Sequence, residues 1–156
     1  MSAGQNRGAK VLNKLGLEWQ AFQDSHAGLT DSQVVAPGVV GEWSVKDLIT
    51  HVTIWEQEAL KHLPLIVAGG SPPRYSTTYG GIDAFNALMM TPRRGLALSE
   101  VRQQAATSHR QLIGYIESVP PELMASESRF RRRLRLDTYG HYPIHTEHIM
   151  KWRKRS

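Results

Sequence analysis

Residues 41–60, GEWSVKDLITHVTIWEQEAL, contain the clearest helix start in the chain. Ser44 has the residue type of an N-cap, and Asp47 stands three positions later, where its side chain can reach the N-cap amide. Apolar residues then recur at steps of three and four and form one arc of a helix: Leu48, Val52, Trp55 and Ala59. The stretch therefore predicts a long amphipathic helix from Ser44 to Pro64 or slightly beyond.

Three further segments have the same helical periodicity. They are about residues 9–27, a segment that opens at Ser99 and ends at the Pro120 and Pro121 pair, and a last one that begins near Gly140 and continues almost to residue 156. Pro143 fits the first turn of the last helix, because no amide donor is needed there. Four amphipathic helices predict an all-α protein of the helical-bundle class.

Shorter elements are expected between these helices. One turn of helix is predicted within residues 29–43 and a short helix at residues 82–90, IDAFNALMM. Residues 129–136, RFRRRLRL, alternate instead, with Phe130, Leu134 and Leu136 on one side, and this alternation predicts a short extended segment before the last helix. The length of 156 residues fits a single domain, residues 1–156.

Composition limits the chemistry and the location. The chain has no cysteine, so a metal ion would need His, Asp or Glu ligands, and neither a disulfide nor a thiolate nucleophile is available. No apolar run approaches the roughly 18–20 residues that span a bilayer, and the start, MSAGQNRGAK, has no signal-peptide core. A cytoplasmic protein that does not bind membranes is expected.

The positive charge is concentrated near the C-terminus. The net charge is +5, and nine of the nineteen Lys and Arg residues lie between Arg129 and Arg155. A basic nucleic-acid-binding module is therefore an alternative function, although no recognised nucleic-acid-binding pattern accompanies the charge. The arginines at 129, 131, 133 and 135 are interpreted either as a solvated edge or as an anchor for an anionic substrate, with Arg133 and Arg135 as candidate contacts.

The last helix contains three histidines on one face. His141 and His145 are spaced i, i+4, which places two imidazoles one turn apart, and His148 and Trp152 continue the same arc of about 60°. His51 lies at the edge of the apolar arc of the helix at 44–64 and supplies a third candidate ligand. Three imidazoles would leave an open coordination position, as in a catalytic metal site, whereas a structural role for the histidines is the alternative.

Two motifs, GEWSVKDLITHVTIWEQEAL and TYGHYPIHTEHI (residues 138–149), resemble the DinB/YfiT-like four-helix-bundle superfamily, and IDAFNA resembles its branch of ClbS and DfsB self-resistance proteins. The resemblance implies an up-down-down-up bundle and a zinc or nickel ion held by His51, His141 and His145. It also implies transfer or isomerisation that uses a low-molecular-weight thiol. The ClbS-like branch implies metal-independent action instead. His148 stands where many members have Gln, so it is expected to be a neighbour of the ligands or a substitute ligand.

Further site residues are predicted around this centre. His148 and Glu58 are the candidate general bases, and Asp47 could accept a hydrogen bond from a ligand. The segment from Gly69 to Gly81 is expected to be a lid. The predicted substrate contacts are Trp55, Arg74, Tyr75, Tyr79, Asn86, Arg133, Arg135 and Trp152.

The expected function is a metal-dependent hydrolase or thiol-dependent transferase that detoxifies a small electrophile. A ClbS-like protein that binds a small molecule without a metal is the main alternative, and a homodimer is expected.

Overall fold

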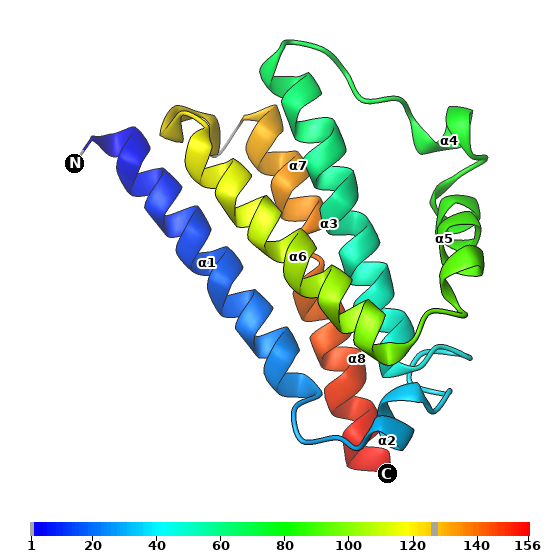
Figure 1. The fold of residues 1–156 in the computed structure, drawn as a ribbon. Helices are drawn as coiled ribbons and strands as arrows, with labels where there is room; N and C mark the ends of the chain where they lie inside the picture. The colour runs from blue at the N-terminus through cyan, green and yellow to red at the C-terminus, as the bar shows by residue number, and fades with distance from the viewer. Residues whose placement is uncertain (1, 126–127) are drawn as a thin grey trace.

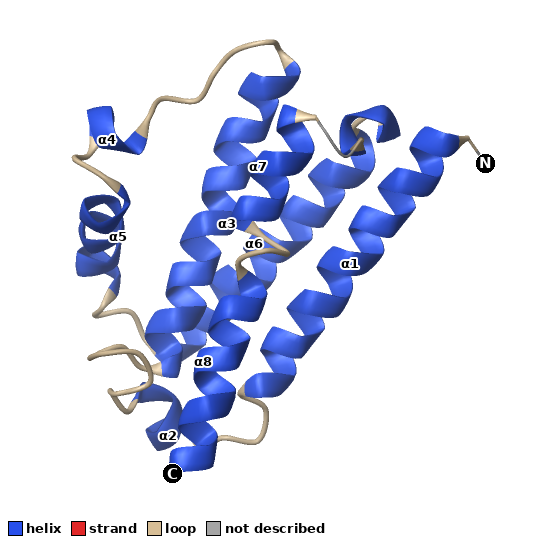
Figure 2. Ribbon diagram, turned by 180° about the vertical axis from the view of Figure 1, so that it is seen from behind, coloured by secondary structure: helices blue, strands red, loops and turns tan. Residues whose placement is uncertain are grey.

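The computed structural model describes residues 2–125 and 128–156 and consists almost entirely of helices and loops (Figure 2). The four long helices are α1 (Ala3–Ser25), α3 (Val45–Val67), α6 (Leu98–Ser118) and α8 (Tyr142–Arg155). The shorter ones are α2 (Asp31–Val35), α4 (Tyr75–Thr78), α5 (Ile82–Met90), α7 (Arg129–Asp137) and the 3-10 helices η1 (Thr91–Arg93) and η2 (Pro121–Met124). No strand forms among the described residues, so the predicted all-α class is confirmed.

The strongest start signal forms the predicted cap. Ser44 is the N-cap of α3, its hydroxyl accepts from the amide of Asp47 at 3.1 Å, and the Asp47 carboxylate accepts from the Ser44 amide at 3.0 Å. The short helices predicted within residues 29–43 and at residues 82–90 are α2 and α5. Local signals therefore locate α2, α3 and α5, whereas α1 begins at Ala3, well before the predicted start near residue 9.

The prediction of an extended segment at residues 129–136 was wrong, because these residues form helix α7. Phe130, Leu134 and Asp137 are buried at the steps of a helix, whereas Leu136, which the alternation placed beside Phe130, is 66% exposed. Ser128 caps the helix by accepting from the Arg131 amide at 2.9 Å. A helix also satisfies its own backbone groups, whereas an extended segment would need a partner strand.

The long helices run in two opposite directions around one core. In Figure 1, α1 leads away from the N-terminus, α3 and α6 both run the opposite way, and α7 followed by α8 returns toward the C-terminus. Helix α3 is central, because it packs on α6 and also contacts α7, α5 and α8. The fully buried side chains of the main core include Leu15, Phe22, Leu48, Leu63, Leu112, Leu134 and Tyr142.

The connection from α3 to α6 lies against one side of α3 (Figures 1 and 2). Phe85 of α5 packs edge-on against Trp55 of α3 with 5.1 Å between ring centroids, and a small second core forms around them. Within the described part of the chain, no helix combines the length and apolarity needed to cross a membrane.

The packing of α1 can be tested with two leucines of the same helix. Leu15 is fully buried, whereas Leu17 is 62% exposed. Leu15→Ala should lower the free energy of unfolding by about 2–5 kcal/mol, because it removes core contacts and leaves a cavity. Leu17→Ala should change this free energy by less than about 0.5 kcal/mol. Urea unfolding followed by circular dichroism measures both, and equal losses would contradict the described face of α1.

Candidate metal centre

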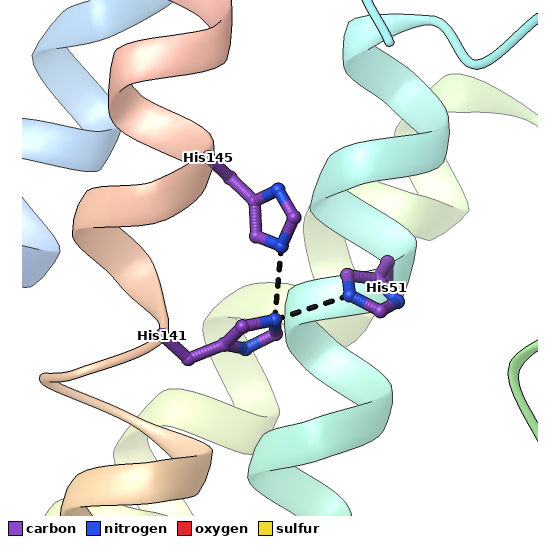
Figure 3. Close-up of side chains that lie close together, drawn as sticks. All are labelled: His51, His141 and His145. Atoms are coloured by element: carbon purple, nitrogen blue, oxygen red, sulfur yellow. Dashed lines mark hydrogen bonds between the residues drawn. The ribbon is translucent and has the colours of Figure 1, made fainter. Parts of the chain in front are cut away.

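Three histidines from two helices converge at one point (Figure 3). His51 lies on α3, His141 occupies the N-cap position of α8, and His145 lies one turn into α8. The Nε2 atom of His141 is 3.1 Å from Nε2 of His51 and 2.9 Å from Nε2 of His145. The structure thus brings together the three residues that the sequence selects as ligands.

A tight turn between α7 and α8 positions His141. The last helix was predicted to begin near Gly140, but it begins at Tyr142 and His141 precedes it. The carbonyl of Thr138 accepts from the amides of His141 and Tyr142, both at 2.8 Å. A Cβ atom on Gly140 would lie 2.7 Å from the carbonyl oxygen of Arg135, so the turn requires glycine at this position.

Hydrogen bonding among the imidazoles does not explain their arrangement. Each neutral imidazole nitrogen carries either one hydrogen or one lone pair, so Nε2 of His141 cannot make two well-formed hydrogen bonds at once. Nitrogens that are 2.0–2.1 Å from one tetrahedral zinc ion lie about 3.3 Å from each other. The two observed separations are slightly shorter than this value, and all three ligand atoms lie within 4.8 Å of one another, so small side-chain shifts would bring them around a divalent ion.

The protonation state of the triad also suits a metal. Burial lowers the pKa of His51, His141 and His145 to about 3 each, and repulsion from a neighbouring imidazole adds to the shift in every case. The side chains are therefore neutral near pH 7. Neutral imidazole is the form that binds a metal ion.

The Nδ1 atoms of the three histidines differ in their hydrogen-bond partners. Nδ1 of His145 lies 3.3 Å from Nδ1 of His148, so His148 stands behind a ligand and not beside the convergence point. Nδ1 of His51 and Nδ1 of His141 are buried without a hydrogen-bond partner among the described residues. The carboxylate of Asp47 bonds to the Ser44 amide, as the capping interpretation predicts.

A cavity of about 930 Å³ opens beside the triad. Trp55 and Asn86 form part of its wall, and the indole N–H of Trp55 donates to Oδ1 of Asn86 at 3.0 Å. The predicted site residues that line the cavity are His51, His141, His145, Trp55, Arg74, Tyr75, Asn86 and Arg133. A space of this size suits a ligand of drug-like dimensions.

Five other predicted site residues do not line this cavity. Tyr79 stacks on Tyr75 with 5.9 Å between ring centroids, and Trp152 packs against the main core. Arg135 is exposed on α7, and His148 and Glu58 lie behind lining residues. Their direct contact with a substrate is therefore not supported by the geometry.

Glu58 belongs to a polar network that holds the segment from Gly69 to Gly81 against α3 and α7. The Tyr75 hydroxyl donates to Oε1 of Glu58 at 2.9 Å and accepts from Nη2 of Arg133 at 2.6 Å. Nε of Arg133 donates to Oδ2 of Asp137 at 2.7 Å. Burial raises the pKa of Asp137 to about 7, and the Arg133 guanidinium opposes that shift. Tyr75 therefore fastens the predicted lid to the bundle.

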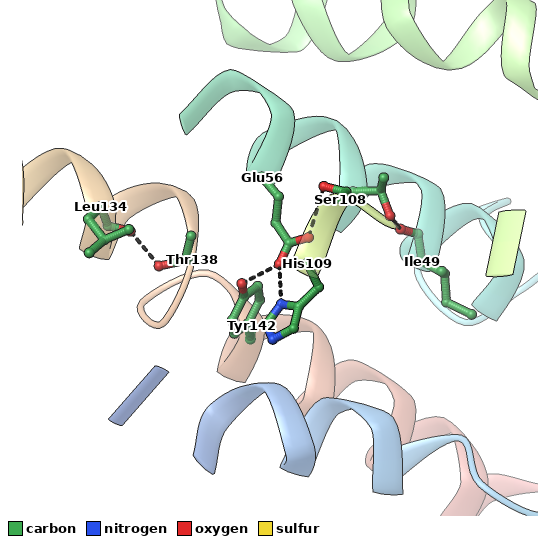
Figure 4. A network of polar contacts seen from close by, with 8 residues as sticks. Ile49, Glu56, Ser108, His109, Leu134, Thr138 and Tyr142 are labelled. Carbon is green, nitrogen blue, oxygen red and sulfur yellow. Dashed lines mark hydrogen bonds and ion pairs between the residues drawn. The ribbon is translucent and has the colours of Figure 1, made fainter. Parts of the chain in front are cut away.

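Sequence analysis missed a second network that lies deeper in the bundle (Figure 4). The carboxylate of Glu56 is fully buried and accepts from Ser108 at 3.1 Å and from Tyr142 at 2.5 Å, and it lies 2.9 Å from Nδ1 of His109. Glu56 follows Val52 by four residues, so its place on the core face of α3 was a signal for a buried carboxylate.

Two cavity arginines were also missed. Arg129 and Arg132 line the cavity together with Arg133 and Leu136, at the i, i+3, i+4 and i+7 positions of α7. The extended interpretation placed Arg129 with Arg131, Arg133 and Arg135 instead. The helical spacing itself was the available signal.

Comparisons with known proteins agree with the fold. No curated protein matches the chain. Among solved structures, the chain is similar to "Sibling Lethal Factor Precursor - DfsB", with a TM-score of 0.77, 95% of each chain covered and 14% sequence identity, a likeness of fold alone. The DinB superfamily matches residues 14–149, which include all three converging histidines. The chain therefore belongs to the DinB superfamily.

Proposed function

We propose that the protein is a divalent-metal-dependent enzyme whose ion is held by His51, His141 and His145. The observation that carries this proposal is the convergence of three neutral Nε2 atoms at the wall of a cavity of about 930 Å³. DinB superfamily proteins are generally metal-binding, and the histidine cluster supports the same property here. Zinc and nickel suit three imidazole ligands and are the metals we expect.

The cavity side of the triad is where a substrate would meet the metal. When bound, the ion would polarise a substrate oxygen or lower the pKa of a water or thiol. The chain's own residues hold this site: His148 supports His145, and the Trp55 and Asn86 pair shapes the wall. The chain has no cysteine, so a thiol reaction would use a low-molecular-weight thiol as co-substrate.

The proposed reaction is hydrolysis of, or thiol transfer to, a small electrophile, with detoxification as the role. Among the described residues that line the cavity, Asp137 is the one carboxylate, and it is paired with Arg133. We propose that His148 and Glu58, the predicted general bases, position His145 and Tyr75 instead. A metal-activated nucleophile needs less help from a protein base than a neutral one.

A second candidate is a protein that binds a small molecule without a metal, as expected for the ClbS-like branch. Two observations favour it. The cavity wall is largely apolar, and Nδ1 of His51 and Nδ1 of His141 find, within the described part of the chain, none of the hydrogen-bond acceptors that usually orient metal ligands. In that case the histidines would line a ligand cavity.

Metal content separates the two candidates. Protein purified without an affinity tag should contain about one equivalent of zinc or nickel by elemental analysis. The His51→Ala, His141→Ala double variant should contain almost none. Returning the metal to chelator-treated wild-type protein at about 100 times its Kd should stabilise the fold by about 2.7 kcal/mol, because the ion binds only the native state.

His26→Asn is the matched control for metal content. His26 lies at the end of α1 against Phe22, with 5.3 Å between ring centroids, and not in the triad. This variant should keep the wild-type equivalent of metal. Wild-type protein that takes up no metal on reconstitution, or a double variant with full occupancy, would overturn the proposed triad and favour the metal-independent candidate.

The Glu56 network should support both the fold and the triad. Tyr142→Phe removes one donor from a buried carboxylate and should lower the free energy of unfolding by about 1–3 kcal/mol. Because Tyr142 adjoins His141, metal affinity should also fall, by up to about tenfold. Tyr115→Phe, at a half-buried tyrosine near Phe130, should change stability by less than about 0.5 kcal/mol.

Urea unfolding and competition with a chromogenic chelator measure these two effects. If Tyr142→Phe were as stable as Tyr115→Phe and bound metal as tightly as the wild type, the network would not position α8.

A further inference from the structure

We infer that the cavity binds an amphipathic organic anion, with a carboxylate, sulfonate or phosphate group facing the arginines of α7 and an apolar body covering the apolar side chains of the wall. The inference rests on the proposed function in one respect, because it names the substrate class of the same cavity. It depends on the charges and walls of the cavity and not on the identity of the metal.

The face of α7 that lines the cavity carries arginine side chains. Arg129, Arg132 and Arg133 line the cavity, whereas Arg131 points to the Tyr139 hydroxyl at 3.4 Å and to the Met124 carbonyl at 3.4 Å. Arg135 lies outside the cavity. Three of the five arginines of α7 therefore line the cavity, and the other two do not.

The cavity wall carries more basic than acidic side chains. Arg74, at the N-cap of α4, joins the arginines of α7, so four guanidinium groups line the cavity. Asp137 is the one acidic residue among the described residues that line it, and its carboxylate is already paired with Arg133 at 2.7 Å. Arg74 and Arg129 add further positive charge, and the partners of Arg129, the Gly70 carbonyl and the Ser71 hydroxyl, are neutral, so the cavity carries an excess of positive charge.

The guanidinium group of Arg133 is held in one orientation by its neighbours. The Arg133 side chain is only 13% exposed, and its guanidinium is held by Asp137, by the Tyr75 hydroxyl and over the Tyr75 ring at 5.6 Å. Arg129 is tied to the connection after α3, because Nη2 donates to the Gly70 carbonyl at 2.8 Å. Oriented guanidinium groups bind carboxylate, sulfonate and phosphate oxygens with less loss of side-chain freedom than mobile ones.

The cavity also has an apolar part. The remaining wall is formed mainly by apolar side chains: Trp55, Ile66, Pro72, Pro73, Ile82, Leu136 and Ile144. Ile82, Leu136 and Ile144 are more than half exposed without a ligand, which is costly unless something covers them. A purely polar anion such as inorganic phosphate would leave this surface uncovered, so the ligand should carry an apolar body.

Two fluorescent probes with the same aromatic skeleton test the inference. The probes are 1-anilinonaphthalene-8-sulfonate, which is amphipathic and anionic, and N-phenyl-1-naphthylamine, which lacks the sulfonate. Wild-type protein should bind the sulfonate at one site and more tightly than the neutral probe. In the Arg74→Gln, Arg132→Gln variant, the Kd of the sulfonate should rise at least about tenfold, while that of the neutral probe stays unchanged.

Arg135→Gln is the matched control, because it removes one positive charge from the same helix outside the cavity. It should leave the Kd of both probes unchanged. Equal weakening by Arg135→Gln, an unchanged Kd in the double variant, or no sulfonate binding to the wild type would each overturn the inference. A circular dichroism spectrum and a urea midpoint equal to those of the wild type show that the double variant is folded.

Metal content of the same samples separates this inference from the proposed function. Sulfonate binding that depends on Arg74 and Arg132 in a protein that takes up no metal would support the anion site and count against the metalloenzyme. One equivalent of metal together with sulfonate binding that ignores these arginines would do the reverse.

Discussion

The buried carboxylate of Glu56 is the constraint on which the arrangement of the helices depends. A carboxylate in the core costs several kcal/mol unless donors replace water, and the protein supplies them from α6 and α8. His109, one of these partners, also stacks on Trp19 of α1 with 4.0 Å between ring centroids. One side chain of α3 therefore fixes its position relative to the three other long helices. Any slide or rotation of α8 would break the bond from Tyr142, so the separation between His51 and His141 is set by the same contact.

The break between α7 and α8 adds a second constraint. A continuous helix through residues 129–155 would carry the arginines and the histidines on faces set by helical spacing alone. The turn at Thr138 and Gly140 frees the two halves from that spacing. Arg132 and Arg133 can then line the same cavity as His141 and His145, although they come from separate helices. The last third of the chain thus supplies both the positive wall and two of the three candidate ligands.

Local patterns were sufficient to predict much of this protein. The capping signal at Ser44 and the limits of α5 depend on local residue patterns, whereas the convergence of the three histidines was predicted from spacing on two helices and from the family resemblance. Residues 129–136 were misjudged because a nine-residue helix contains too few turns to distinguish period 3.6 from alternation when five of its nine residues are arginine. Glu56 and Glu58 show the other limit. The hydrogen-bond partners that enclose them lie 17 to 86 positions away, so no local pattern could identify these contacts.

The proposed metal ligands include no carboxylate, and this determines the charge of the cavity. Three imidazoles contribute no negative charge, so a divalent ion held by them would keep its full charge, whereas carboxylate ligands would reduce it. The arginines of α7 add to the same positive field, and apolar walls keep the local dielectric constant low. Both effects favour an anionic ligand, and both favour the deprotonated form of a water or thiol near the triad. The arginine wall and a divalent ion held by the histidine triad would therefore both attract anions. Because the arginines and a divalent ion at the triad would repel each other, an anionic ligand between them would stabilise both.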